Sequence, residues 1–531
     1  MHTHTRAHRG TALAGAALLT AVALAGCDGS AKAGSTGGAG KADGAAPGRT
    51  ASTTATPAPG PSALPAALTS QKPDWKRCAA PEGGNAPGSA WRCATIQVPL
   101  DYRKPDGDTI GIALIKRGAT STAKRIGSLL FNFGGPGGSG VGTLPLAAEG
   151  YGRLNARYDL VSFDPRGVAA SEGVNCRSDG ETEASLKRVD LTPDTPAEEA
   201  AFMKDGADTG AGCEKGSGKV LPYLTTTNTA RDMDLIRQVL GDRKLYYFGM
   251  SYGTELGGTY AHLFPGNVGR VVLDAVVDPT ADTVGHARNQ ATGFQRALEN
   301  YLKDRGEDPQ AGNARIARLL AKLDKDPLPT DSGRMLSESL AVIGIVTPLY
   351  SQSEWPLLTQ ALDEAENNGT GNTLLALADS YNGRDENGHY DTMTQSQRAI
   401  SCADSTARPT ADQARALLPE FRKLSPVFGP FLAWDTAGWC SDWPVAGEHD
   451  TPEASAPGAA PILVIGTTGD PATPYEGARR MATELGKGVG VLLTNKGEGH
   501  GSYGNGTCVT ARTDSYFLDG KVPADGSVCS S

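Results

Sequence analysis

From Trp75 onward the chain is a succession of short apolar runs, and this pattern constrains the fold more than any other feature. The runs cover residues 96–100, 110–115, 128–133, 158–163, 245–248, 271–277, 462–465 and 489–493. Several are continuously apolar, which is typical of strands buried on both faces of a mostly parallel sheet. Helical patterns lie between some of them, such as residues 229–240 with Gly241 as the stop signal. Strands that alternate with helices predict an α/β fold.

Between Asp278 and Pro461 the strand pattern disappears and helical patterns replace it. These patterns cover residues 294–302, 316–323, 355–366 and 411–418. We therefore expect a mainly helical insertion, residues 279–455, that lies over the sheet as a lid. Residues 71–278 and 456–531 are then the two parts of one α/β core.

The first 27 residues have the features of an export signal. Two arginines precede an apolar run over residues 11–24, which is too short to span a bilayer comfortably and ends in small residues. The ending L-A-G-C at residues 24–27 resembles a bacterial lipobox, in which Cys27 becomes the lipidated first residue. An ordinary signal peptide with an incidental cysteine is the alternative. Residues 28–70, rich in Gly, Ala, Ser, Thr and Pro, are expected to form a flexible tether.

Composition excludes some classes of function and indicates the compartment. Fifty Lys and Arg against 59 Asp and Glu give a net charge of −9, and no basic block indicates nucleic-acid binding. Besides Cys27 there are eight cysteines, an even number that predicts up to four disulfides in an exported chain. We expect pairing in sequence order, which closes loops of modest length: Cys78–Cys93, Cys176–Cys213, Cys402–Cys440 and Cys508–Cys529. Other connectivities remain open. No Cys-x-x-Cys pair or His-rich spacing indicates zinc, and we expect no metal or cofactor.

One serine has a sequence context suited to nucleophilic catalysis. A predicted strand ending at Phe248 runs into G-M-S-Y-G at residues 249–253, and a helix-like stretch follows. Such a strand-to-helix turn projects the serine hydroxyl above the sheet, and the glycines leave room for a strained backbone. The helix N-terminus also places backbone N–H groups near a developing oxyanion. G-x-S-x-G occurs by chance in a chain with 68 glycines, so the strand and helix around it make Ser251 the candidate nucleophile.

A serine hydroxyl is a weak nucleophile and needs a base. Of the eight histidines, His500 alone follows a strand-like run between glycines, in a loop that would let the imidazole reach the serine. Asp470 follows another strand-like run and is the candidate that orients the imidazole. Its rivals are Asp274 and Asp278. The chain order Ser251, Asp470, His500 is the one expected for an α/β-hydrolase.

A glycine-rich loop completes the predicted site. G-G-P-G-G-S-G at residues 134–140 follows the strand that ends at Phe133 and can supply a second backbone N–H beside that of Tyr252. Gly135 is the expected donor, with Gly134 as the alternative. A phosphate-binding loop is the competing interpretation, but the Lys-Ser/Thr ending of a P-loop is missing and the glycine spacing is not that of a dinucleotide site.

Together these motifs resemble the secreted tripeptidyl aminopeptidase family of actinobacteria, a branch of the proline-iminopeptidase-like α/β-hydrolases with a C-terminal TAP-like region. Further matches are V-P-L-D-Y at residues 98–102, D-P-R-G at 164–167, T-T-N-T-A at 226–230, C-S-D-W-P at 440–444, D-P-A-T-P at 470–474 and G-H-G at 499–501. We expect D-P-R-G to brace the structure and not to act in catalysis. Phe133 stands where proline iminopeptidases usually have a histidine, which speaks against strict release of proline.

The resemblance implies an exported serine exopeptidase that removes short peptides, expected to be tripeptides, from free N-termini through an acyl-enzyme. Such an enzyme must also pair the substrate ammonium with a carboxylate. Glu255, near the nucleophile, and Asp404, beside Cys402, are the candidates, and both are also compatible with ordinary helix-face or loop charges. An esterase or lipase with the same triad, or a non-catalytic peptide-binding lipoprotein, are the alternatives. The expected partners are peptides with free N-termini, and a lipid anchor is the only expected membrane contact. We expect the protein on the outer face of the cell membrane, or released outside the cell. The oligomeric state is left open.

Overall fold

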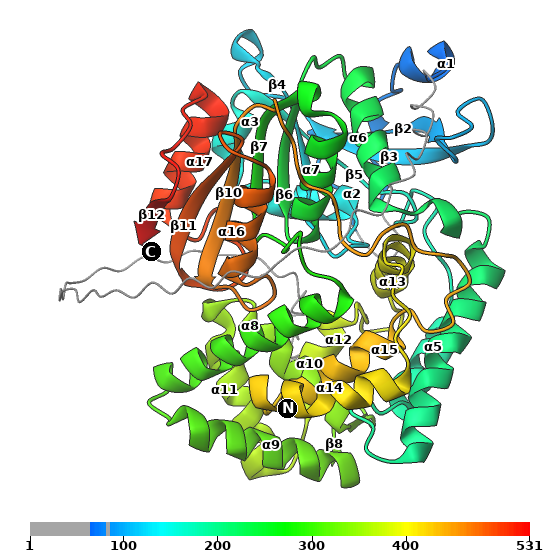
Figure 1. Ribbon diagram of the computed structural model, residues 1–531, viewed down its shortest axis with the longest axis vertical. Helices are drawn as coiled ribbons and strands as arrows, with labels where there is room; N and C mark the ends of the chain where they lie inside the picture. Colours follow the sequence, from blue (N-terminus) through cyan, green and yellow to red (C-terminus); the bar gives the residue numbers. More distant parts are fainter. Residues whose placement is uncertain (1–63, 81–84, 531) are drawn as a thin grey trace, which may run out of the picture.

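The structure, a computed structural model, describes residues 64–80 and 85–530. The expected signal segment, Cys27 and most of the expected tether lie outside these residues. A ten-stranded sheet forms the centre, in the order β1-β2-β3-β5-β4-β6-β7-β10-β11-β12 (Figure 1). Its strands are β1 (Lys76–Arg77), β2 (Trp91–Pro99), β3 (Thr109–Arg117), β4 (Gly127–Asn132), β5 (Tyr158–Phe163), β6 (Leu245–Met250), β7 (Val268–Asp274), β10 (Ile462–Gly469), β11 (Gly490–Glu498) and β12 (Ser527–Ser530).

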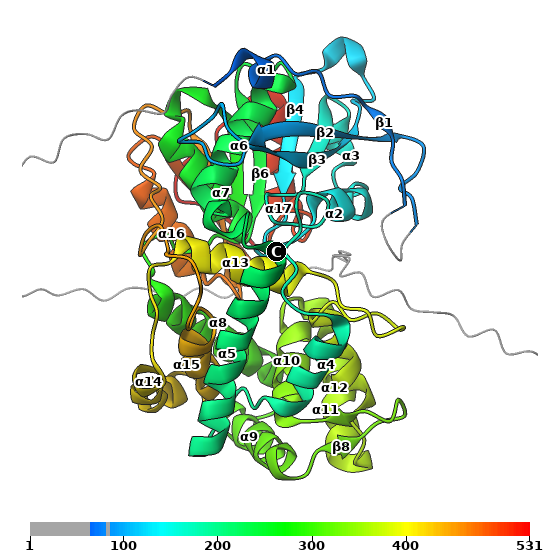
Figure 2. The ribbon, with the colours of Figure 1, turned by 90° about the vertical axis from the view of Figure 1, so that its right-hand side faces the viewer.

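The predicted mostly parallel sheet is confirmed. The neighbouring strands in the run β5-β4-β6-β7-β10-β11-β12 pair in parallel. At the other edge, the pairs β1–β2, β2–β3 and β3–β5 are antiparallel. All six residues of β4 are buried, as expected for a central strand covered on both faces. One face is covered by α6 (Thr226–Val239), α7 (Tyr252–Leu263) and α16 (Tyr475–Glu484), and the other by α2 (Gly140–Ala147), α3 (Gly152–Asn155) and α17 (Thr507–Asp519) (Figure 2).

A helical part lies next to the carboxyl ends of the central strands (Figure 1). It contains α8 (Thr283–Asp304), α9 (Pro309–Lys325), α10 (Glu338–Leu349), α11 (Trp355–Asp363), α12 (Asn372–Tyr381), α14 (Ala411–Leu424) and α15 (Gly429–Gly438). The short strands β8 (Leu328–Pro329) and β9 (Met335–Leu336) pair with each other in the same part. The helices enclose an apolar core of their own, separate from the two cores that flank the sheet.

The helical part also includes a segment that lies within residues 71–278, which the sequence pattern assigns to the α/β part. Helices α4 (Asp179–Arg188) and α5 (Pro196–Ser217) leave the sheet after β5, and α5 packs along α15 (Figure 2). Phe202 of α5 contacts Trp434 of α15, with ring centroids 5.8 Å apart. Conversely, α13 (Met393–Asp404) packs Ala399 and Ile400 into a core beside the sheet. The expected boundaries at residues 278 and 455 divide the chain by sequence, but helices on both sides of them pack into the same apolar cores. The apolar face of each helix decides which core it joins.

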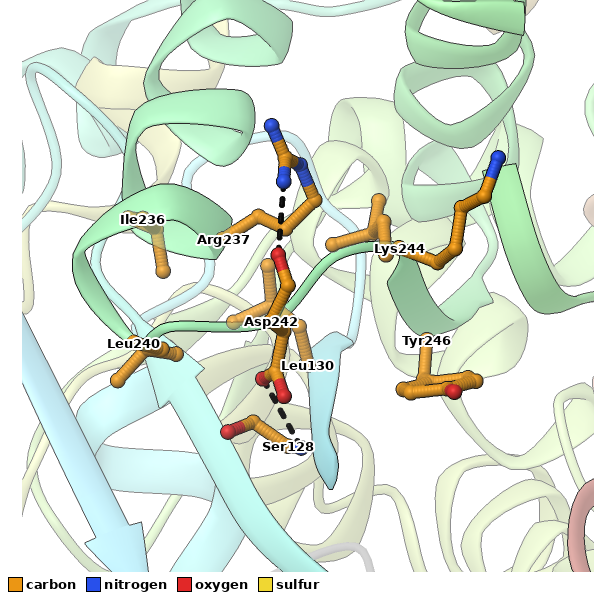
Figure 3. A pocket seen from close by; sticks show the side chains of 9 residues that line it. Ser128, Leu130, Ile236, Arg237, Leu240, Asp242, Lys244 and Tyr246 are labelled. Carbon is orange, nitrogen blue, oxygen red and sulfur yellow. Dashed lines mark hydrogen bonds between the residues drawn. The ribbon is translucent and has the colours of Figure 1, made fainter. Parts of the chain in front are cut away.

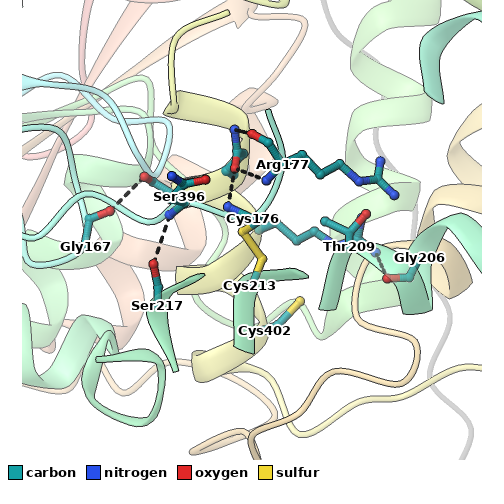
Figure 4. The surroundings of a disulfide bond; sticks show 12 residues. Gly167, Cys176, Arg177, Gly206, Thr209, Cys213, Ser217, Ser396 and Cys402 are labelled. Carbon is teal, nitrogen blue, oxygen red and sulfur yellow. Dashed lines mark hydrogen bonds between the residues drawn. A yellow bond between two sulfur atoms is a disulfide. The ribbon is translucent and has the colours of Figure 1, made fainter. Parts of the chain in front are cut away.

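Four disulfides join the eight cysteines of the described residues in the order that we expected: Cys78–Cys93, Cys176–Cys213, Cys402–Cys440 and Cys508–Cys529. Figure 4 shows the Cys176–Cys213 bridge, which ties the segment before α4 to α5, with Cys402 of α13 nearby. Four bridges are typical of exported proteins. Within the described residues we find no helix with the length and hydropathy that a membrane span requires.

The amino end of β6 is closed by the turn that leads out of α6 (Figure 3). The Asp242 carboxylate accepts a hydrogen bond from the Ser128 N–H at 3.1 Å, and the Asp242 carbonyl accepts one from the Arg237 guanidinium at 2.7 Å. The hollow beside them holds about 10 Å³, room for about one water molecule. This hollow is too small for an organic substrate. Ser251 lies at the other end of β6, in the turn to α7.

Candidate active site

Ser251 occupies the sharp turn between β6 and α7. Its φ of 57° and ψ of −127° lie in a region that residues other than glycine rarely adopt. The Ser251 N–H donates to the Asp274 carbonyl at 3.1 Å, which ties the turn to β7. A Cβ atom on Gly249 would lie 2.2 Å from the Gly253 carbonyl oxygen, and one on Gly253 would lie 2.6 Å from the Asn132 carbonyl oxygen. Both glycines are therefore needed for the turn to close.

Asp470 and His500, which follow β10 and β11, meet above the sheet. The Nδ1 atom of His500 lies 2.9 Å and 3.1 Å from the two carboxylate oxygens of Asp470. Asp470 is fully buried and also accepts hydrogen bonds from the Ala472 N–H at 3.0 Å and the Thr473 N–H at 2.9 Å. The Thr473 hydroxyl donates to the second oxygen at 3.0 Å. Asp470 is thus held in place by its own loop and can orient the imidazole.

The two rival carboxylates have other partners. Asp274 accepts hydrogen bonds from the Ser502 N–H, at 3.1 Å and 3.0 Å, and from the Tyr503 N–H at 2.8 Å. It therefore fixes the backbone of the loop that carries His500. Asp278 accepts from Thr280 and Asn289 and pairs with Arg480. Neither carboxylate accepts a hydrogen bond from the imidazole.

The histidine loop is held between the serine turn and the helical part. A Cβ atom on Gly501 would lie 2.4 Å from the Cε atom of Met250, the residue before Ser251. On the other side, the His500 N–H donates to the Tyr350 carbonyl at 2.8 Å, and the Tyr350 ring meets the imidazole edge to face at 5.4 Å between centroids. Sequence reasoning missed Tyr350, because nothing local in the sequence relates the end of α10 to a loop about 150 residues later.

The pH dependence of activity should report the charge around His500. Burial alone lowers the pKa of the imidazole, but the charge and hydrogen bond of Asp470, with the charge of Asp274, outweigh it and raise the pKa above its ordinary value of 6.5. A general base must be unprotonated, so kcat/KM should fall as the pH drops through this raised pKa. The acid limb, measured on a neutral nitrophenyl ester so that amine-binding groups do not contribute, is expected above pH 6.5. An acid limb at or below 6.5 would contradict this.

The glycine loop lies directly against the serine turn. A Cβ atom on Gly134 would lie 2.7 Å from the Ser251 Cβ and 3.1 Å from the Tyr252 nitrogen. Gly134 and Gly135 have φ values of 96° and 112°, which favour glycine. The Gly134 N–H donates to the Asn132 side chain at 3.0 Å. Among the described residues, the N–H groups of Gly135 and Tyr252 donate no hydrogen bond, so the geometry favours Gly135 over Gly134 as the second oxyanion donor.

Two segments outside the loop brace it, α13 and the D-P-R-G segment. The Gln397 amide of α13 donates to the Gly135 carbonyl at 3.2 Å. Asp164 accepts from the Ser139 hydroxyl at 2.7 Å and the Val141 N–H at 3.0 Å. The neighbouring Arg166 is fully buried and paired with Asp232 at 2.6 Å. D-P-R-G therefore has the bracing role that we expected.

Glu255 and Asp404 approach each other beside the serine turn. Glu255 lies on α7, one turn after Ser251; burial raises its pKa to about 7, and its carboxylate has no hydrogen bond or ion pair among the described residues. Asp404 is buried and accepts from the Thr226 N–H and hydroxyl, both at 2.7 Å. The same hydroxyl lies 2.6 Å from the Tyr252 hydroxyl. Burial, and next the charge of Glu255, raise the pKa of Asp404, so the two carboxylates interact.

Asp404 also belongs to a second group of potential ligands. Asp404, Glu448 and His449 each offer a ligand atom, and these atoms lie within 4.8 Å of one another. Both oxygens of Asp404 already accept hydrogen bonds from Thr226. The group can carry negative charge and therefore suits a positively charged ligand atom.

Known proteins resemble this chain over most of its length. Residues 425–529 match the family model described as TAP-like protein. The chain is 37% identical to serine protease Hip1 of Mycobacterium tuberculosis, over 86% of this chain and 91% of that protein. It is 34% identical to carboxylesterase B of the same species, over 87% of this chain and 91% of that protein. It is 30% identical to tripeptidyl aminopeptidase of Streptomyces lividans, over 86% of each chain.

Proposed function

This chain belongs to the tripeptidyl aminopeptidase family of α/β-hydrolases and is a serine hydrolase, and from that premise we propose that it is an exported exopeptidase. It removes short peptides, tripeptides in this proposal, from free N-termini. The observation that carries the proposal is the pair of carboxylates beside the turn of Ser251. Glu255 is partly buried and makes no hydrogen bond or ion pair among the described residues, and Asp404 is buried and held by Thr226. A partly buried carboxylate without a protein partner next to the nucleophile suits the ammonium of a free N-terminus.

In this mechanism the Ser251 hydroxyl attacks the scissile carbonyl while His500 takes its proton, and Asp470 stabilises the imidazolium that forms. The negative oxygen accepts hydrogen bonds from the N–H groups of Gly135 and Tyr252. The imidazolium then gives its proton to the leaving amine. A water molecule, deprotonated by His500, attacks the acyl-enzyme and releases the short peptide.

Glu255 is the group that binds the substrate ammonium. Burial raises its pKa to about 7, so a substantial fraction is neutral in the free enzyme near neutral pH. An incoming ammonium favours the ionised carboxylate and forms a charge-assisted hydrogen bond with it. Asp404, held by Thr226, adds negative potential at the same place.

Replacing Glu255 with glutamine should therefore affect only substrates with a free amine. For a tripeptidyl nitroanilide, kcat/KM is expected to fall by about 10- to 100-fold, the size of a lost charge-assisted hydrogen bond. Turnover of the N-acetylated peptide should be unchanged. The matched control is Glu484→Gln, an exposed glutamate of α16. Equal turnover of the free and acetylated peptides by the wild-type enzyme would refute the aminopeptidase function.

An esterase is the second candidate, because one relative is named carboxylesterase B. The triad and the oxyanion donors act equally on esters and amides. Parallel assays on the tripeptidyl nitroanilide and a short-chain nitrophenyl ester separate the two. Activity on the ester alone would favour the esterase.

We also propose that the protein is anchored to the membrane through lipid on Cys27. Four disulfides support export. Metabolic labelling with a radioactive fatty acid, compared between wild type and Cys27→Ala, tests the anchor. Label that persists in the variant would exclude it.

A further inference from the structure

Helix α15 is buried on all sides but one. Most of its residues, including Leu432, Trp434 and Thr436, are buried, whereas Phe431, Asp435 and Trp439, the residue that follows the helix, are partly accessible. Side chains four residues apart lie on one face of a helix. These three residues therefore form a single accessible stripe, an aspartate between two aromatic rings.

The carboxylate of Asp435 has no partner. Among the described residues it accepts no hydrogen bond and makes no ion pair. Burial raises its pKa to about 6, although the charge of Arg398 acts in the opposite direction. Arg398 itself donates to the carbonyls of Gly206 and Gly438 and lies over the Trp439 ring, 5.5 Å from its centroid. Because Asp435 is partly accessible and accepts no hydrogen bond from the described residues, its carboxylate is open to a positively charged group of a ligand.

The neighbours of Asp435 connect it with the catalytic groups on two sides. Arg398 follows Gln397, whose amide donates to the Gly135 carbonyl of the oxyanion loop. On the other side, burial and the charge of Asp435 raise the pKa of Tyr381. The Tyr381 ring packs against that of Tyr350, with centroids 6.3 Å apart, and Tyr350 in turn meets His500.

Tyr381 shows that accessible surface lies between these groups. It keeps 47% of its surface accessible to water. Its ring packs against Tyr350, which meets His500, and the charge of Asp435 acts on it. Accessible surface near His500 therefore extends toward Asp435, where a short peptide held at Ser251 would contact it.

We propose that Asp435, Phe431 and Trp439 form a subsite for the side chain of a lysine or arginine in the released peptide. The aromatic rings pack against the aliphatic stem and attract the cation, and the carboxylate binds its charged end. The substrate ammonium has no such stem and is assigned to Glu255. This inference rests on the proposed peptidase function and adds a preference for a basic residue.

The test compares lysine with norleucine, which keeps the stem and lacks the charge. Each is placed in turn at the three positions of a tripeptidyl coumarin amide. At one position the wild-type enzyme is expected to prefer lysine by about 10- to 100-fold in kcat/KM. Asp435→Asn should remove at least about tenfold of this preference and leave the norleucine peptides within about twofold, and Asp435→Glu should restore part of it. The control Glu420→Gln, an exposed partner of Arg288, should keep the preference.

Several outcomes would overturn the proposal. The wild-type enzyme could show no preference for lysine at any position, or Asp435→Asn could retain it. An equal loss for lysine and norleucine peptides, with a lower unfolding temperature, would make Asp435 a structural partner of Arg398. Lost discrimination between free and acetylated N-termini would assign Asp435 to the ammonium. Failure of the proposed function is visible separately, because that discrimination is then absent from the wild-type enzyme.

Discussion

Replacing Ser251 with alanine is expected to lower kcat for the tripeptidyl nitroanilide by about 10⁵- to 10⁶-fold, with little change in KM. The hydroxyl is the group that forms the acyl-enzyme, and without it His500 and Asp470 have no nucleophile to activate. Hydrolysis of the nitrophenyl ester should be lost as well, whichever substrate is the natural one. The measurement is steady-state kinetics with active-site titration.

The fold should survive this change. The Ser251 hydroxyl makes no hydrogen bond among the described residues, and the turn is shaped by Gly249 and Gly253. The thermal unfolding midpoint of Ser251→Ala is therefore expected to match that of the wild type. Ser353→Ala, which removes a surface hydroxyl bonded to Ser351, is the matched control and should keep full activity. Activity that survives in Ser251→Ala would remove Ser251 from the mechanism.

Replacing Asp470 with asparagine should lower kcat by about 10⁴-fold. The asparagine amide favours the wrong imidazole tautomer and cannot stabilise the imidazolium. Asp470 also accepts from the N–H groups of Ala472 and Thr473, so an amide N–H turned toward them leaves donors without an acceptor. A loss of about 1–3 kcal/mol in the free energy of unfolding should accompany the loss of activity. Kinetics and denaturant unfolding measure the two effects.

Asp274→Asn is the informative comparison for this prediction. Asp274 holds the backbone of Ser502 and Tyr503 and does not contact the imidazole, so its replacement should affect the position of the loop more than the tautomer of His500. The activity loss is expected to be smaller than in Asp470→Asn. The reverse order, with Asp274→Asn the more damaging in kcat at equal stability, would assign the orienting role to Asp274.

Much of the fold could be predicted from local patterns. The apolar runs correspond to β2–β7, β10 and β11. Central strands such as β4 are covered on both faces and therefore need apolar residues at successive positions. The family predicted from the motifs is the one that the relatives confirm. Ser251, Asp470 and His500 were indicated by chain order and by the strands that precede them. The sequence did not show that Phe202 of α5 packs into the helical part, because a helix pattern shows which face is apolar but not which core that face joins.

The sequence by itself determined the sheet, the serine turn and the order of the candidate catalytic residues, since these follow from local periodicity and from the steric freedom of glycine. Only the tertiary structure decided which distant groups meet. Thr226 and Asp404, 178 residues apart, share two hydrogen bonds, and Tyr350 covers His500. Likewise, Asp435 is left without a partner by the packing around α15. Such contacts depend on how whole helices pack, and no local pattern records that packing.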